Sequence, residues 1–193
     1  KSKYNDIVRR MYDALYKMNV GVDFIHPGSE DLERYKLIVV PALYAAPDEL
    51  LHRLNAYAAG GGHVVYTFKS GFADECLKVR TSVQPGIIGE ACGIGYSLFV
   101  EPGGAAFKGE PFGVGRDEHG IESWMELIQP TTAEVLAYYD HPYWGGYAAI
   151  TRNSYGEGVA YYIGCMAGEA VMAGLLEQAV KEAGLWGKDQ ELR

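Results

Sequence analysis

One continuous run, residues 21–75, constrains the fold of this chain more than any other part of its sequence. Leu37–Val40 is entirely apolar and rich in β-branched residues, which is typical of a strand buried on both faces. The helical pattern of Asp48–Ala59 follows and ends at three glycines, and residues 63–68 form the next strand-like segment. This alternation predicts a doubly wound α/β sheet, in which loops at the strand C-termini form the edge available for function.

The segments around this run extend the predicted core. Residues 4–18 carry apolar side chains at spacings of three and four, which predicts an amphipathic helix. Residues 20–25 are predicted as a strand that ends at a Pro-Gly turn, and residues 86–93 as a short helix. We therefore expect a mostly parallel, flavodoxin-like sheet flanked by helices over about residues 1–95.

After Gly95 the pattern changes to short strands separated by turn residues. We expect strands over residues 96–101, 123–128, 134–139, 147–151 and 158–163, with a long glycine-containing excursion over 102–120. A closing helix is predicted over residues 168–183. Residues 1–193 are thus predicted to be a single α/β domain. Its antiparallel extension and closing helix cover about residues 96–185.

Charge and cysteine content exclude several classes of function. The net charge of -8, without clustered Lys or Arg, argues against a nucleic-acid partner, and no apolar stretch is long enough to span a membrane. The three cysteines are odd in number and widely spaced, which is typical of reduced thiols in a cytoplasmic protein. The five histidines lack metal-ligand spacing, so we expect neither a metal nor a cofactor.

A long ordered set of short motifs matches a known family over nearly the whole chain. The matching pieces are Val22-Asp23-Phe24, Asp31-Leu32, Tyr35 to Tyr44, Gly61-Gly62, Ser70-Gly71, Asp74-Glu75, Pro85-Gly86, Glu90, Thr151-Arg152-Asn153, Tyr155-Gly156, Gly158 and Ala160-Tyr161-Tyr162. Together they resemble the middle domain of glycoside hydrolase family 42 β-galactosidases, usually called the trimerisation domain. The length of the match is more specific than any one motif.

The resemblance implies a parent enzyme that hydrolyses terminal non-reducing β-D-galactosides with retention. Its catalytic glutamates and most of its substrate contacts belong to a TIM barrel that this sequence lacks. The chain itself is then noncatalytic, and its partner is itself, in a homotrimer. The resemblance also implies a strand ahead of the first helix, whereas this sequence begins at that helix. We expect that strand either to be absent or to be replaced by another segment.

The fold also resembles class I glutamine amidotransferases, which carry a cysteine nucleophile on a tight turn after a strand. The corresponding loop here, residues 68–72, has no cysteine, and Ser70 is its only candidate nucleophile. The expected histidine is replaced by Ile163-Gly164-Cys165-Met166, so the Ser70 hydroxyl is expected to bond the turn backbone instead. Cys92 ends a short helix, at the pole that disfavours a thiolate, and is expected to be a buried apolar residue.

Two groups of residues remain as candidates for binding, and no residue is expected to be catalytic. The first group lies in the loop at the functional edge of the sheet and is a candidate for a subunit interface or an active-site edge: Ser70, Phe72, Asp74 and Glu75. The second is an aromatic turn that suits either a sugar or an interface: Tyr143, Trp144 and Tyr147. Two alternatives therefore stay open, a standalone amidotransferase-like hydrolase using Ser70 or Cys92, and a sugar-binding module.

Overall fold

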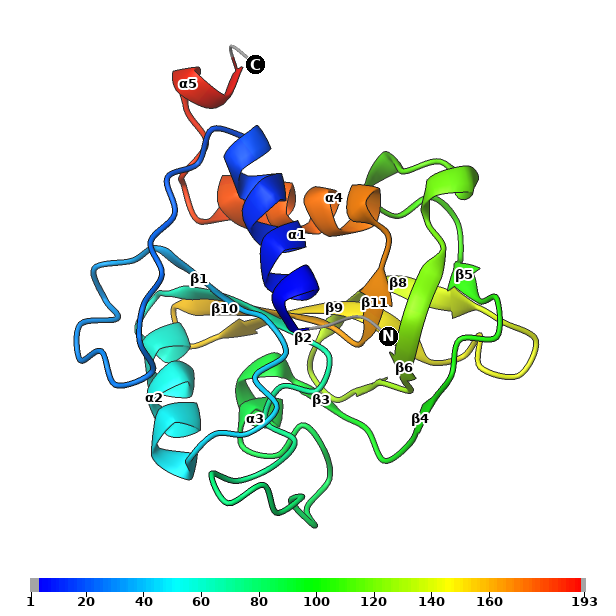
Figure 1. Cartoon of the computed structure of the whole chain (residues 1–193), viewed down its shortest axis with the longest axis horizontal. Helices are drawn as coiled ribbons and strands as arrows, with labels where there is room; N and C mark the ends of the chain where they lie inside the picture. The colour runs from blue at the N-terminus through cyan, green and yellow to red at the C-terminus, as the bar shows by residue number, and fades with distance from the viewer. Residues whose placement is uncertain (1–3, 192–193) are drawn as a thin grey trace.

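The computed structural model describes residues 4–191 and places a mixed sheet at the centre of the fold (Figure 1). Its strands, in spatial order, are β1 (Leu37–Val40), β2 (His63–Thr67), β10 (Gly158–Ile163), β9 (Ala148–Tyr155), β8 (Glu134–Asp140) and β5 (Ala106–Phe107). β1, β2 and β10 run parallel, and the remaining strands are each antiparallel to the neighbour before them. The predicted combination of parallel strands with antiparallel strands in one α/β fold is confirmed.

Helices cover both faces of this sheet (Figure 1). α1 (Tyr4–Lys17) and α4 (Glu169–Glu182) lie together on one face, and α2 (Asp48–Ala59) and α3 (Ile88–Cys92) lie on the other. Each face therefore has its own apolar core. Because it is covered on both sides, β10 is buried at every residue, as expected for a strand at the centre of such a fold.

Smaller elements surround the sheet on the side of its antiparallel strands. β11 (Cys165–Ala167), β6 (Ile121–Glu126) and β4 (Phe99–Val100) form a second sheet, and β3 (Ile94–Gly95) pairs with β7 (Gln129–Pro130). The excursion over residues 102–120 contains β5 and the short 3-10 helices η1 (Pro111–Gly113) and η2 (Arg116–Glu118), and α5 (Lys188–Glu191) follows α4. No helix within residues 4–191 is long and apolar enough to cross a membrane.

Two expectations about the parallel part of the sheet are wrong. Residues 20–25 form no strand, and β1 is the edge strand, with Ile38 and Val40 buried but Leu37 and Val39 only partly covered. A strand forms only against a neighbour, and no described segment pairs with the outer edge of β1. The parallel core is also not confined to residues 1–95, because its third strand is β10, which the sequence pattern places in the antiparallel extension.

The predicted strand over residues 96–101 is also wrong in its extent. Only β4, of two residues, lies within this range, because β3 ends at Gly95 and Tyr96 forms just an isolated bridge with Gln84. By contrast α2 and β10 have the bounds that the sequence predicts, and α1, α3 and α4 agree within one or two residues.

Candidate functional site

The loops that follow β1 and β2 meet β6 at one edge of the sheet, and their backbones are strained there. Ala42 after β1, Lys69 after β2 and Trp124 in β6 all have positive φ, at 40°, 64° and 56°. Residues other than glycine rarely adopt this conformation, and such strain gathers at functional sites. The turn at Lys69 leads into Ser70, the candidate nucleophile of the sequence. Its position is fixed because Thr67 Oγ1 accepts a 2.6 Å hydrogen bond from the Ala42 N–H.

A fully buried carboxylate, Glu126, lies behind this turn. Its Oε1 accepts hydrogen bonds from the Lys69 N–H at 2.8 Å, the Trp124 indole N–H at 2.9 Å and the Tyr96 hydroxyl at 3.0 Å. Its Oε2 accepts a fourth, from the Tyr162 hydroxyl at 2.8 Å. Four donors from separate segments therefore converge on one side chain and join the turn after β2 to β6 and β10.

The buried environment of Glu126 disfavours the ionised form of its carboxyl group. Burial raises the pKa of the Glu126 carboxyl to about 7, and the four hydrogen bonds, led by that from Trp124, hold the pKa below where burial alone would place it. No Lys, Arg or His within residues 4–191 forms an ion pair with this carboxylate. The group is therefore stabilised by dipoles alone, and its protonation state changes near neutral pH.

Aromatic rings line the outer side of the same edge. Tyr44 stacks on Phe72 with ring centroids 5.4 Å apart, Phe72 meets Phe99 edge-on at 6.0 Å, and Phe99 stacks on Trp124 at 4.2 Å. The Lys69 ammonium lies 3.9 Å from the centroid of the Trp124 ring. We call Tyr44, Phe72, Phe99 and Trp124 the aromatic surface. It is held from behind by Glu126 through the indole N–H of Trp124.

The candidate nucleophiles are not placed for catalysis. Ser70 is fully buried, and its Oγ accepts a hydrogen bond from the Leu43 N–H at 3.2 Å, which is the structural role that the sequence predicts. Cys92 ends α3 and is fully buried, and that burial raises the pKa of its thiol. Among residues 4–191, no three His, Cys, Asp or Glu side chains gather in a way that could hold a metal ion.

The loop residues predicted beside Ser70 separate into different roles. Phe72 belongs to the aromatic surface. Asp74 Oδ1 accepts hydrogen bonds from the Cys76 and Lys78 N–H groups, both at 2.9 Å, so its carboxylate stabilises the loop turn. Glu75 is exposed on the same loop. Of this group, the structure brings Phe72 and the buried Ser70 to the strained edge.

Comparison with known proteins decides the family. The family model described as the β-galactosidase trimerisation domain matches residues 1–186. This chain belongs to the β-galactosidase trimerisation domain family. The β-galactosidase LacZ of Heyndrickxia coagulans is 36% identical over 174 residues, 89% of this chain and 25% of that protein. BgaB of a Geobacillus strain is 33% identical over 92% of this chain and 26% of its own length.

Solved structures agree with this assignment. The β-galactosidase of Bacillus circulans sp. alkalophilus matches with a TM-score of 0.85 and 31% identity, over 95% of this chain and 28% of that one. The cold-adapted β-galactosidase of Rahnella sp. R3 matches with a TM-score of 0.87 and 26% identity, over 96% of this chain and 28% of that one. The trimerisation domain described here thus spans about a quarter of the length of its curated relatives.

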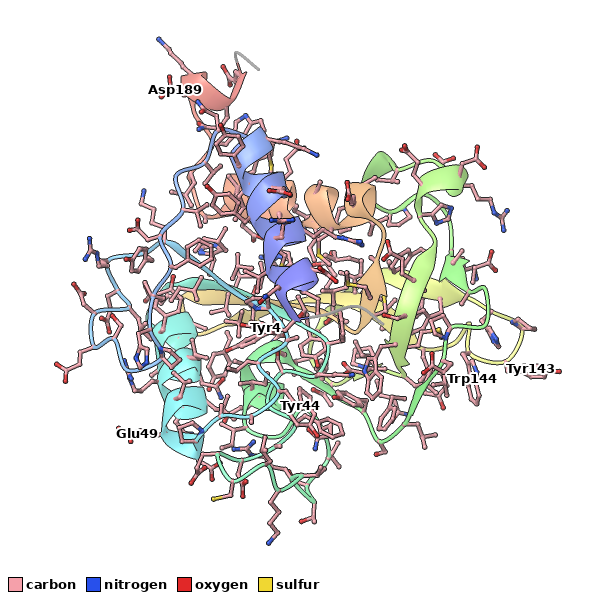
Figure 2. All side chains as sticks on the ribbon, viewed as in Figure 1. Tyr4, Tyr44, Glu49, Tyr143, Trp144 and Asp189 are labelled. Atoms are coloured by element: carbon pink, nitrogen blue, oxygen red, sulfur yellow. The ribbon has the colours of Figure 1, made fainter. Side chains whose placement is uncertain are left out.

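The second predicted group lies on another part of this trimerisation domain. Tyr143, Trp144 and Tyr147 occupy the turn between β8 and β9, which Figure 2 shows well away from Tyr44. Trp144 stacks on His141 at 6.2 Å and also meets Tyr147 at 6.2 Å, and both residues pack against the core. Tyr143 is the exposed member, at 81%. The turn therefore offers a ligand one largely exposed ring, which contacts the His141 ring at 5.8 Å.

The sequence alone did not identify several residues of the site. The sequence pattern places Tyr96, Phe99, Trp124 and Glu126 in ordinary strands, and it places Tyr44 and Lys69 in loops. One signal was available in the sequence. Trp124 and Glu126 are two residues apart in a short strand, so their side chains are expected on the same face of it. A carboxylate on the buried face of a strand is costly without hydrogen-bond partners. The other three partners, Lys69, Tyr96 and Tyr162, come from distant parts of the chain.

Ser70→Ala is expected to lower the free energy of unfolding by about 1 kcal/mol, because the partly buried Leu43 N–H loses its acceptor. Urea unfolding measures this change. The exposed Ser97→Ala is the control, and its effect should stay within about 0.5 kcal/mol. Equal effects of the two substitutions would contradict the assigned hydrogen bond.

Stability should also depend on pH through Glu126. Its pKa is raised in the folded state, so the native protein holds the proton more tightly than the unfolded chain does. The resulting stabilisation is complete below about pH 4.5 and is lost as the pH rises to about 7, an effect of order 3 kcal/mol. Glu126→Gln removes the titrating group. The unfolding free energy of the wild type minus that of this variant should fall as the pH rises from about 4.5 to about 7. A difference that stays constant over this pH range would contradict the raised pKa of Glu126.

Proposed function

We propose that this chain is the noncatalytic trimerisation domain of a larger β-galactosidase. In that enzyme, other domains bind and hydrolyse a terminal β-D-galactoside, and this domain holds three copies together. The match of residues 1–186 to the family model carries the proposal. It is supported by the strained turn after β2, where Lys69 and a buried Ser70 stand in place of an accessible nucleophile.

The proposal includes the finer features expected from the sequence. Residues 1–193 form one α/β domain related to the flavodoxin-like and amidotransferase-like folds, and the sharp turn at Lys69 supports that relationship. The parent enzyme is cytoplasmic, since the three cysteines, all free, suit a reducing compartment. A ring of three copies needs heterologous contacts, so two different faces of the domain must be complementary.

A turnover assay tests the absence of catalysis. The purified chain is incubated with a chromogenic β-galactoside, alongside the Ser70→Ala variant prepared from the same host. We expect no turnover from either preparation beyond the level of a mock purification. Turnover by the wild-type chain that Ser70→Ala abolishes would contradict the proposal and favour the hydrolase alternative.

A sugar-binding module is the second candidate, and the exposed ring of Tyr143 is the observation in its favour. Galactose or lactose is titrated to about 50 mM, a range that detects millimolar affinity, while tryptophan fluorescence is followed. Trp144 lies next to Tyr143 and would report binding there. We expect a flat response, and a saturable change that Tyr143→Ala removes would favour sugar binding instead.

A further inference from the structure

The four groups that donate to Glu126 differ in how they can respond when the carboxylate gains a proton. The Lys69 backbone N–H and the Trp124 indole N–H, both bound to Oε1, can only donate. The hydroxyls of Tyr96, on Oε1, and of Tyr162, on Oε2, can donate and accept. Among residues 4–191, Oε2 therefore has one hydrogen-bond partner, Tyr162, and that partner can change from donor to acceptor.

The two tyrosine hydroxyls also contact each other, so they form a triangle with the Glu126 carboxyl group. A proton on Oε2 would be donated to the Tyr162 oxygen, and the Tyr162 hydroxyl would turn to donate to the Tyr96 oxygen. Tyr96 would keep its bond to Oε1. Each member of this ring then donates one hydrogen bond and accepts one from another member. The buried pocket can therefore satisfy the neutral acid as well as the carboxylate.

The other titratable groups that face Glu126 do not change charge near neutral pH. Burial raises the pKa of the four weak acids around it, which lie after β3, in β8, in β10 and in β11: Tyr96, Tyr139, Tyr162 and Cys165. The turn after β2 contributes a cation, Lys69, whose ammonium lies over the Trp124 ring and forms no ion pair within residues 4–191. Burial raises the pKa of Glu126 to about 7, so this carboxyl group is the member of the cluster that titrates there.

The charge of Glu126 sets the strength of the bonds that hold the strained edge. Hydrogen bonds to an ionised acceptor are roughly twice as strong as those to a neutral one. Lys69 and Trp124 both have positive φ, and each donates to this carboxylate. Strained backbone persists only where the surrounding interactions fix it. Neutralising Glu126 therefore weakens the two bonds that hold the turn after β2 and the Trp124 ring of the aromatic surface.

We propose that Glu126 is a pH-sensitive switch for this edge of the sheet. When ionised, it holds the turn at Lys69 and the aromatic surface firmly. When protonated, it closes the hydrogen-bond ring with Tyr162 and Tyr96 and loosens that edge. The proton comes from solvent and neutralises the carboxylate, so the closed ring carries no charge. The switch goes beyond the proposed function and does not depend on it, because a single copy of the chain contains every group involved.

The protonation of Glu126 is measured by infrared difference spectroscopy of the 193-residue chain between about pH 8 and about pH 6. A neutral carboxylic acid has a carbonyl band that a carboxylate lacks, and carboxyl groups with ordinary pKa values of about 4 stay ionised over this range. We expect one acid band that grows with a midpoint near pH 7 and that Glu126→Gln removes. A wild-type spectrum without an acid band at about pH 6 would overturn the switch.

The hydrogen-bond ring is tested with Tyr162→Phe, which removes the acceptor of the acid proton and leaves the three donors on Oε1 in place. The acid band should then move to higher wavenumber, as it does for a carboxyl group whose O–H has no acceptor. A band that stays at its wild-type position would contradict the ring.

The loosening is measured by NMR at the Trp124 indole N–H, whose signal is assigned with Trp124→Phe. We expect this signal to move with the same midpoint as the acid band. Its protection from hydrogen exchange, relative to a free indole at the same pH, should fall about fivefold to tenfold on protonation. Glu126→Gln has a neutral oxygen at this place, so its Trp124 signal should stay near the acid limit of the wild type. The indole of Trp186, which follows α4, should show no step at this midpoint.

Two further results would overturn the switch. An acid band that titrates while the wild-type Trp124 signal and its exchange protection stay constant would mean that protonation leaves the edge unchanged, and this result needs no variant that must fold. A step in the Trp124 signal that persists in Glu126→Gln with the same midpoint would assign the titration to another group.

Discussion

Replacing Gly158 with alanine is expected to prevent this domain from folding. A Cβ atom added at Gly158 would lie under 3.0 Å from the carbonyl oxygens of both Gly62 and Ala58, closer than real Cβ atoms come. Neither oxygen can move freely, because Ala58 is in α2 and the Gly62 carbonyl accepts the Val159 N–H at 3.2 Å. The clash therefore separates β10 from the end of α2. We expect a loss of about 4 kcal/mol or more in unfolding free energy.

Far-ultraviolet circular dichroism and urea unfolding measure this loss. Gly146→Ala is the matched control, since Gly146 has no atom within 4 Å of its added Cβ and no positive φ. The control should fold and stay within about 1 kcal/mol of wild type. A folded Gly158→Ala chain with nearly wild-type stability would contradict the packing of α2 on β10.

Glu126→Ala is expected to have the second-largest effect. It leaves four donors without their acceptor, and the hydroxyls of Tyr96 and Tyr162 are too deeply buried to reach bulk water. Each buried polar group left unpaired costs about 1–3 kcal/mol, which water entering the vacated space partly offsets. We expect a net loss of about 4 kcal/mol, a large part of the stability of a typical domain.

Glu126→Gln separates the hydrogen bonds from the charge. The amide oxygen can accept from Lys69, Trp124 and Tyr96, and the amide nitrogen can donate to the Tyr162 hydroxyl once that hydroxyl rotates. At pH 8 this variant should therefore lose less than half of what Glu126→Ala loses, as measured by urea unfolding. Equal losses for the two variants would mean that the hydrogen bonds do not stabilise the fold.

The elements that the sequence predicts correctly are those with local signals. α2 has acidic residues in its first turn and glycines at its end, and β10 is a short apolar run that begins at a glycine. Both were predicted with their observed bounds. Residues 20–25 contain Val, Phe and Ile, which favour strands, but they form no strand, because pairing depends on a neighbour that local sequence does not specify. The parallel pairing of β10 with β2 is likewise a long-range contact.

In the candidate site too, residues with a local sequence signal were predicted, and residues defined by long-range contacts were not. Phe72 was predicted at this edge because the turn after β2 has a recognisable pattern, and Ser70 was correctly assigned a backbone hydrogen bond. The central residue, Glu126, was missed because its four partners lie up to 57 residues away along the chain. Convergence of distant donors on one carboxylate is a property of the folded structure, and neither spacing nor composition reveals it.

The solution mass of the 193-residue chain tests its assembly most directly. Size-exclusion chromatography with light scattering gives this mass over protein concentrations of about 1 to 100 μM, a range that detects micromolar association. The proposed function predicts a species of three times the 21.2 kDa chain mass, which dissociates only on dilution. A mass of 21.2 kDa at every concentration would contradict it, because the chain would then lack an interface sufficient for trimerisation.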